Sequence, residues 1–311
     1  MIRVDGLRKR YGDQVVLDGL DLEVDRGERV AVLGLNGAGK TTLLQCLLGL
    51  VGFEGSVRVD GQPAGPAGKE ARRRIGYVPQ RPPVFDMTVS SFLQLFSDLR
   101  DVPVEPAAER LSEFGLPPDE VGGKEMSALS GGMLQKTLLA LALGAEVPVL
   151  LLDEPTASLD PSSRREFVRV LEGVDEERTI LFATHRLEDV ESLANRVILI
   201  HGGGVVFDGT LRDLWERSGV GGELWVQVPA PRRDAAVALL RDRASVREVD
   251  EDGGGGVRVE LTPGGAMDAL GALRDRGIEV EDFRALSPAL DEVMDRLLTA
   301  GGDGAARREA G

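Results

Sequence analysis

The stretch GLNGAGKTT, residues 34–42, decides the fold of this chain. It contains the pattern G-x-x-x-x-G-K-T between an apolar, strand-like run at 30–33 and a helix-like run at 43–48. In that context the glycines let successive backbone N–H groups converge on a phosphate at a helix N-terminus. The alternative is a Gly-rich turn before an ordinary buried helix. Lys40 disfavours it, because lysine is rare in this arginine-rich chain, and we therefore expect a nucleoside triphosphate site.

Two acidic residues follow the apolar run at 149–152, namely Asp153 and Glu154. A buried parallel strand delivers such acids at its carboxyl end, where ligands bind in open α/β sheets. We expect Lys40 to reach the terminal phosphates, Thr41 and Asp153 to bind Mg²⁺, and Glu154 to orient the attacking water. The residues expected to line the triphosphate site are Gly34, Leu35, Asn36, Gly37, Ala38, Gly39, Lys40, Thr41 and Thr42.

A second potential anion site lies in LSGGM, residues 129–133. Gly131 and Gly132 leave backbone amides bare at the expected start of a helix, and Ser130 adds a hydroxyl. A lone SGG is more often an ordinary helix start. Two phosphate-binding helix starts in one chain favour the functional interpretation.

The composition limits the class of protein. A length of 311 residues predicts about two domains, and the net charge of −15 disfavours nonspecific nucleic-acid binding, which depends on neutralising phosphates. The single cysteine, Cys46, excludes an internal disulfide framework and suits a reducing cytoplasm. The first residues lack the apolar core of a secretory signal, and no apolar run approaches the ~20 residues needed to cross a bilayer. We therefore expect any membrane spans to come from another chain.

The N-terminal part, residues 1–217, is expected to be a doubly wound α/β core. Its apolar runs show no alternation, as expected for parallel strands buried on both faces, and they lie at 30–33, 149–152, 179–183 and 197–200. A separate antiparallel β layer is expected from 2–4, 20–24 and 56–60. Helical patterns broken by prolines predict a helical insertion at 86–126.

A second, smaller domain is expected after SGVGG, residues 218–222, which is predicted to be a linker. The accessory domain, 223–298, is predicted to have the order β-α-β-β-α-β of a ferredoxin-like α+β fold. The predicted strands lie at 223–228, 245–249, 257–261 and 278–283, and the predicted helices at 233–243 and 264–276. An amphipathic helix is predicted at 287–298, and the Gly- and Ala-rich tail at 299–311 is expected to be disordered.

In this combination the chain resembles the ATP-binding subunits of ABC transporters, over roughly residues 1–217. Residues 34–42 match the Walker A motif of that family, LSGGM its signature motif and 149–154 its Walker B motif. The resemblance implies further site residues, which are Tyr11 stacking on adenine, Gln80 as the Q-loop residue that contacts Mg²⁺ and the membrane subunit, Asp160 in the D-loop and His185 as the switch histidine. His201 matches no family motif and is expected to be structural.

The resemblance implies ATP and Mg²⁺ as cofactors, with Glu154, His185 and Lys40 as catalytic residues. It also implies a homodimer, in which the phosphate loop of one subunit and Ser130, Gly131 and Gly132 of the other hold the same ATP. Its closing and opening would move multi-span membrane subunits through Gln80 and the 86–126 insertion, at the inner face of the cell membrane. Met133 departs from the Gln usual in the family, and a thioether is a poor hydrogen-bond partner. We still expect an active ATPase, since the phosphate contacts come from Ser130 and backbone amides.

Other functions remain as alternatives. A soluble ABC-type ATPase acting on nucleic acid or ribosomes usually has two nucleotide domains, long coiled coils or zinc-binding cysteine pairs, which this sequence lacks. A P-loop kinase or GTPase would leave LSGGM and His185 without a role. The C-terminal part resembles the accessory end of ABC-2 exporter ATPases. One subgroup of similar length serves copper-enzyme maturation for nitrous oxide reductase, and drug, polysaccharide and lipid export are also open.

Overall fold

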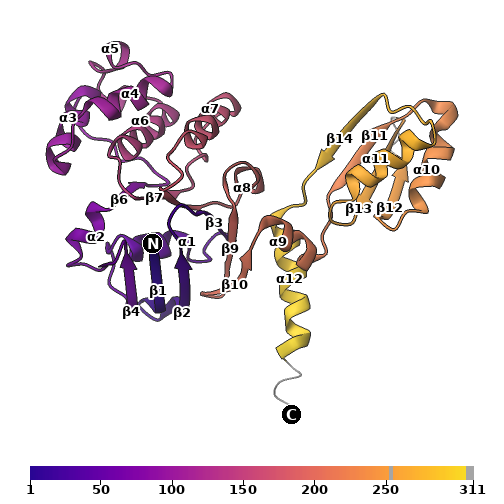
Figure 1. The fold of residues 1–311 in the computed structure, drawn as a ribbon, viewed down its shortest axis with the longest axis horizontal. Helices are drawn as coiled ribbons and strands as arrows, with labels where there is room; N and C mark the ends of the chain where they lie inside the picture. The colour runs from indigo at the N-terminus through magenta and orange to yellow at the C-terminus, as the bar shows by residue number, and fades with distance from the viewer. Residues whose placement is uncertain (252–254, 306–311) are drawn as a thin grey trace. The chain divides into compact units, whose positions relative to one another are not determined.

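The chain forms two compact units, Met1–Thr210 and Leu211–Gly311 (Figure 1). The computed structural model describes residues 1–251 and 255–305, the side chains of 299–305 excepted. In this part of the chain no helix is both long and apolar enough to span a membrane.

The first unit is built on a six-stranded sheet in the order β10-β9-β3-β8-β7-β6. These strands are β3 (Arg29–Leu33), β6 (Ile75–Val78), β7 (Val149–Asp153), β8 (Thr179–Ala183), β9 (Arg196–His201) and β10 (Gly204–Gly209). All neighbouring pairs are parallel except the β9–β10 hairpin. Every residue of β7 and β8 is buried, which explains why their sequences do not alternate. The predicted mostly parallel α/β sheet is confirmed.

A second sheet in this unit is antiparallel, in the order β2-β1-β4-β5. Its strands are β1 (Ile2–Tyr11), β2 (Gln14–Val24), β4 (Glu54–Val59) and β5 (Gln62–Pro63). Helix α1 (Lys40–Leu47) begins directly after the phosphate loop, and its Leu43, Leu44 and Leu47 pack in one hydrophobic cluster with residues of both sheets. The core therefore fixes the loop between the two sheets.

The remaining helices of the first unit are α2 (Lys69–Arg73), α3 (Val89–Arg100), α4 (Glu105–Glu113), α5 (Pro118–Val121), the 3₁₀ turn η1 (Met126–Ala128), α6 (Gly131–Gly144), α7 (Pro161–Glu172) and α8 (Leu187–Leu193). Among them, α2 and α6 contact the parallel sheet, while α3, α4 and α5 lie beyond α6 (Figure 1). Elements α3 to η1 form the helical segment predicted at 86–126. Its α4 packs against α6, the helix that begins at the LSGGM segment.

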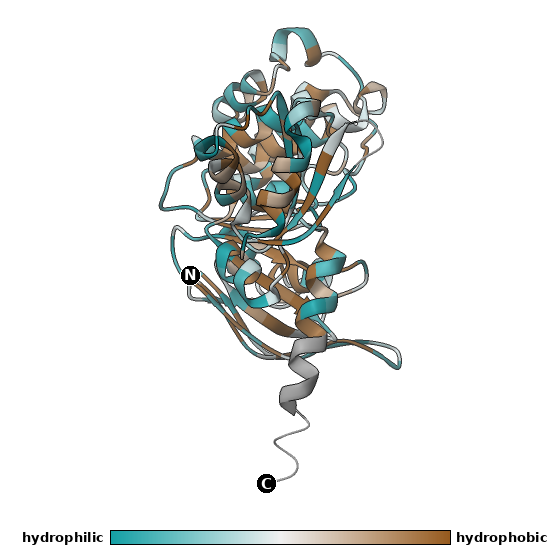
Figure 2. Cartoon of the chain, turned by 90° about the vertical axis from the view of Figure 1, so that its right-hand side faces the viewer, coloured by the Kyte–Doolittle hydropathy of each residue, from teal (hydrophilic) through white to brown (hydrophobic). Residues whose placement is uncertain are grey.

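The second unit has the β-α-β-β-α-β order expected of a ferredoxin-like fold. Its elements are α9 (Leu211–Ser218), β11 (Glu223–Gln227), η2 (Ala230–Arg232), α10 (Arg233–Arg241), β12 (Val246–Glu251), β13 (Gly256–Leu261), α11 (Gly265–Asp275), β14 (Asp282–Leu286) and α12 (Leu290–Ala305). The sheet order is β12-β13-β11-β14, and every pairing is antiparallel. Hydrophobic and hydrophilic residues alternate along β11 and β13, and hydrophilic residues cover much of the outer surface of the helices (Figure 2).

The boundary between the units differs from the sequence-based expectation. The chain divides after Thr210 rather than after Arg217, because α9 packs against α12 within the second unit. The segment 218–222, predicted to be a linker, is also packed there. Val220 is buried, and the Leu261 N–H donates to the Gly222 carbonyl at 3.0 Å. A Cβ at Gly221 would overlap the Leu261 carbonyl, so the glycine allows close approach rather than flexibility.

Two further elements are shifted. The last strand, predicted at 278–283, is found at Asp282–Leu286. Gly277 is left-handed, with φ +66°, and the N–H of buried Ile278 donates to the Leu273 carbonyl, so these apolar residues cap α11 instead of beginning a strand. The helix predicted at 287–298 begins at Leu290 and continues to Ala305, into the tail expected to be disordered. Glycine weakens a helix interior by about 1 kcal/mol without blocking it. Residues 306–311 of that tail lie outside the described residues.

Candidate active site

The phosphate loop holds its lysine in a defined position. Lys40 is the first residue of α1 and is 7% exposed, and its Nζ donates to the carbonyls of Gly34 at 2.7 Å and Leu35 at 3.3 Å. Gly39, which precedes the helix, has φ +102°, and a Cβ there would lie 2.9 Å from Leu17 Cδ2. The left-handed backbone and the close approach of β2 together favour glycine at this position. Burial lowers the pKa of Lys40, while the charges of Glu154 and Asp153 oppose that shift.

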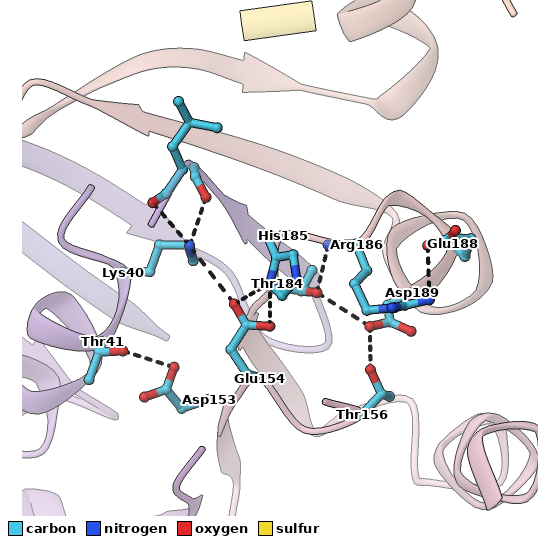
Figure 3. Close-up of polar contacts among 12 residues, drawn as sticks. Lys40, Thr41, Asp153, Glu154, Thr156, Thr184, His185, Arg186, Glu188 and Asp189 are labelled. Carbon is cyan, nitrogen blue, oxygen red and sulfur yellow. Dashed lines mark hydrogen bonds and ion pairs between the residues drawn. The ribbon is translucent and has the colours of Figure 1, made fainter. Parts of the chain in front are cut away.

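The two acids at the end of the Walker B strand occupy different surroundings. Asp153, the last residue of β7, is 1% exposed, and its Oδ1 accepts a hydrogen bond of 3.1 Å from the Thr41 hydroxyl (Figure 3). Burial raises the pKa of Asp153, against the opposing effect of the Thr41 hydrogen bond. Glu154 is also buried, and its Oε1 lies 3.9 Å from Lys40 Nζ. Two buried carboxylates thus share one buried ammonium.

Glu154 also contacts the histidine identified from the sequence. His185 Nδ1 lies 2.9 Å from Glu154 Oε1, and the histidine side chain is 48% exposed (Figure 3). Glu154 has φ +47°, a left-handed conformation that is uncommon outside glycine. Its N–H donates to the Ala183 carbonyl at 2.9 Å, which joins the loop after β7 to the end of β8. The fold therefore brings together Lys40, Glu154 and His185 from three separate segments.

A cavity of about 320 Å³ lies over the phosphate loop. It is lined by Gln14, Val16, Asn36, Gly37, Ala38, Gly39, Lys40, Thr41, Thr42, Gln80 and Glu154. Gln80 and Glu154 therefore line the same cavity as the loop. Gln14 and Val16 were missed by the sequence reasoning. The signal that could have found them is their place at the start of β2, immediately after the Tyr11 turn.

The other expected site residues lie outside the residues that line this cavity. Tyr11 is 45% exposed, its ring faces Lys9 Nζ at 4.5 Å, and its hydroxyl donates to Gln45 at 3.4 Å. Ser130 caps α6 by accepting the Met133 N–H at 3.2 Å, with Gly131 and Gly132 in the first turn of that helix.

Asp160 has a structural role visible in this chain. It caps α7 by accepting the N–H groups of Ser162 at 2.8 Å and Ser163 at 3.0 Å. Its hydrogen bonds, with those from Ser163 the strongest, lower its pKa. The structure thus leaves its expected role toward ATP as a prediction.

The donor atoms beside the loop suit a hard cation. The Thr41 hydroxyl, the Asp153 carboxylate and the Gln80 amide offer oxygen, and Mg²⁺ is usually held by one or two carboxylates with water and phosphate oxygens. No group of three or more His, Cys, Asp or Glu forms a metal cage among residues 1–251 and 255–305. The residues present therefore fit a cation held jointly with a phosphate ligand.

Known proteins resemble this chain in both sequence and structure. Residues 17–157 match the family described as ABC transporter. The daunorubicin resistance ATP-binding protein DrrA3 of Streptomyces coeruleorubidus is 37% identical over 307 residues, which cover 94% of each chain. The Nod factor export ATP-binding protein I of Ralstonia nicotianae is 37% identical over 220 residues, which cover 69% of this chain and 68% of that protein.

Solved structures agree with this relationship. One described as the ATP binding subunit of an ABC transporter has a TM-score of 0.64 at 29% identity, covering 70% of this chain and 93% of that one. A dimeric structure of MJ0796, a bacterial ABC transporter cassette, has a TM-score of 0.61 at 25% identity, covering 68% of this chain and 99% of that one. The chain therefore belongs to the ABC transporter family, as an ATP-binding subunit related to exporter ATPases.

Proposed function

We propose that two copies of this chain enclose ATP between them and hydrolyse it to drive export through separate multi-span membrane subunits. The observation that carries the proposal is the convergence of Lys40 and His185 on buried Glu154, at the wall of the cavity over the phosphate loop. A cation for phosphate, a carboxylate for water and an imidazole beside it are groups suited to phosphoryl transfer to water.

Each group has a distinct task in this proposal. The Lys40 ammonium leaves the Gly34 carbonyl to bind the terminal phosphates, and the loop N–H groups bind the remaining phosphate oxygens. Glu154 accepts the proton of the attacking water, and His185, at 2.9 Å, fixes the orientation of that carboxylate and contacts the γ-phosphate. Thr41, Asp153 and Gln80 would hold Mg²⁺, which neutralises charge on the phosphate oxygens when bound.

The second half of the site comes from the other copy. Ser130 lies at a helix N-terminus and lines no part of its own chain's cavity, so we assign Ser130, Gly131 and Gly132 to the γ-phosphate of a neighbouring subunit. Asp160 belongs to the same dimer contact, and exposed Tyr11 stacks on adenine. Closing of the pair around ATP and its opening after hydrolysis form the power stroke.

The relatives support the proposed direction of transport. Those named above are a drug-resistance protein and a Nod factor export protein, which supports export as the direction of transport. Gln80 and the helical segment α3–η1 are assigned to the contact with the membrane subunits, which would hold the chain at the cytoplasmic face. Action on nucleic acid or ribosomes is disfavoured by the net charge of −15. Copper-enzyme maturation stays a prediction of the sequence resemblance.

The test is ATP turnover and ATP-dependent dimerisation of Glu154→Gln. Glutamine keeps the shape and removes the base, so turnover should fall by about 10²- to 10⁴-fold while ATP now traps a stable dimer, seen by light scattering. Adding Ser130→Ala should weaken that dimer. His185→Ala should also lose turnover, whereas His201→Ala, the matched control at the only other histidine, should not. Full activity of Glu154→Gln would refute the assignment.

A further inference from the structure

A second polar cluster lies beside the Glu154–His185 pair, formed by Thr156, Thr184 and Asp189 (Figure 3). Asp189 belongs to α8 and is 1% exposed. Its Oδ2 accepts hydrogen bonds from the Thr156 hydroxyl at 2.5 Å and the Thr184 hydroxyl at 3.3 Å. Both threonines are fully buried as well. Burying a carboxylate is costly unless polar partners compensate it, so this cluster requires an explanation.

Each threonine lies close in sequence to one member of the proposed reacting pair. Thr156 follows Glu154 by two residues, in the loop after β7. Thr184 immediately precedes His185, in the loop after β8. One carboxylate on a third element therefore ties together the two loops that carry the base and the histidine. The Thr184 oxygen also accepts the Arg186 N–H at 3.0 Å, which fixes the residue on the other side of His185.

The backbone of Glu154 shows why such a tie is needed. With φ +47°, this non-glycine residue occupies a strained region that persists only where its surroundings determine it. The Ala183 carbonyl holds its N–H, and the Ala157 N–H donates to its carbonyl at 3.1 Å. Asp189 adds two side-chain ties, one to Thr156 within this turn and one to Thr184 in the neighbouring loop.

A cation close to Asp189 is Arg164 of α7, whose Nε lies 4.0 Å from Asp189 Oδ1. Neither of these two atoms has a hydrogen-bond partner among the described residues. The charge of Asp189 is therefore only loosely paired, and its hydrogen bonds come from the two threonine hydroxyls, with the one from Thr156 the shorter. That pattern fits a residue that orders two loops better than one that provides a tight ion pair for stability.

We propose that Asp189 is a positioning residue for ATP hydrolysis, which sets the distance between Glu154 and His185 by fixing Thr156 and Thr184. The inference rests on the proposed roles of Glu154 and His185. It assigns no contact with ATP to Asp189, so its loss should slow turnover without weakening nucleotide binding.

The test uses Thr156→Val and Thr184→Val, which keep side-chain shape and remove one hydroxyl each, beside Asp189→Asn. Thr179→Val is the matched control. Thr179 is fully buried, lies at the start of β8, the strand that Thr184 follows, and is hydrogen-bonded to Asp25 and Gly27. We expect kcat per folded molecule to fall about tenfold or more in the first three variants, comparable to the roughly 10- to 100-fold loss when a partner that orients a metal ligand is removed. KM and ATP affinity should change less than about twofold. Thr179→Val should lower Tm and leave kcat within about twofold.

A double-mutant cycle separates positioning from plain destabilisation. If Thr184 acts through the histidine, Thr184→Val should have little further effect on single-turnover hydrolysis once His185→Ala is present. Additive losses, or a kcat for the Thr156 and Thr184 variants equal to that of Thr179→Val, would overturn the inference. Active Glu154→Gln would instead overturn the proposed function, so the two failures are distinguishable. The valine variants keep the test valid if Asp189→Asn does not fold.

Discussion

Lys40 should stabilise the first unit as well as bind phosphate, and Lys40→Met tests this. The ammonium lies 3.9 Å from Glu154, and both side chains are almost fully buried, at 7% and 6% exposed. Asp153, 1% exposed, is a second carboxylate whose charge acts on Lys40. Methionine keeps most of the side-chain volume but leaves two buried acids without their cation. It also removes the donor to the Gly34 and Leu35 carbonyls.

The size of the effect follows from the burial. Removing one partner of a buried ion pair costs about 3–5 kcal/mol, because the other charge stays buried and uncompensated. The unit spans Met1–Thr210, a size for which each kcal/mol shifts Tm by about 2–4 °C. Lys40→Met should therefore lower the Tm of this unit by roughly 6–20 °C at pH 7 without nucleotide.

The decrease in Tm caused by Lys40→Met should become smaller as the pH falls. Burial raises the pKa of Asp153, and the charge of Lys40 opposes that rise, so the variant should raise this pKa further. A carboxyl group with a folded-state pKa above its unfolded value costs stability when ionised. That cost is full above the folded pKa and vanishes below the unfolded one. The Tm difference between wild type and Lys40→Met should thus shrink as the pH falls from about 7.5 to about 5.

The assay is calorimetric or circular-dichroism melting of both proteins across that pH range. Lys136→Met is the control, since Lys136 lies 2.6 Å from Glu166, whose side chain is 25% exposed and can regain water. We expect Lys136→Met to lower Tm less than Lys40→Met does, and with less dependence on pH. An unchanged Tm for Lys40→Met, or a Tm difference that does not vary with pH, would refute the reasoning.

Two further predictions concern helix α1 and the phosphate loop that precedes it. Gly37→Ala and Gly39→Ala should each cost about 1–2 kcal/mol of stability, because both glycines have a left-handed backbone. Only Gly39→Ala also places a Cβ against Leu17, so it should lower Tm and ATP affinity more than Gly37→Ala does. Equal losses in the two variants would contradict the packing argument. Cys46 is fully buried, and burial raises its pKa to about 11, so a thiol reagent at pH 8 should label it only after unfolding. Rapid labelling of the folded protein would contradict its placement in the core.

Much of the fold could be predicted because it depends on local patterns. Non-alternating apolar runs predicted strands buried on both faces, and β7 is such a strand. The alternation of elements after residue 222 predicted the ferredoxin-like order that the sheet pairing shows. The errors lie where packing decides. Gly221 lies in a segment predicted to be a linker, but it allows two backbone segments to approach each other. Ile278 was predicted to begin a strand, but its N–H caps helix α11.

The chemical groups of the site and their types were determined by the sequence alone: a lysine and threonine after a glycine loop, two acids after an apolar strand, and a histidine further on. Such groups can be predicted because each motif is short and carries its own local geometry. Only the tertiary structure decided their partners. His185 and Glu154 meet at 2.9 Å because β7 and β8 are neighbours in the sheet, and Asp189 joins their loops because α8 folds back beside them. Those contacts depend on how distant segments pack, and residue spacing along the chain contains no measure of that.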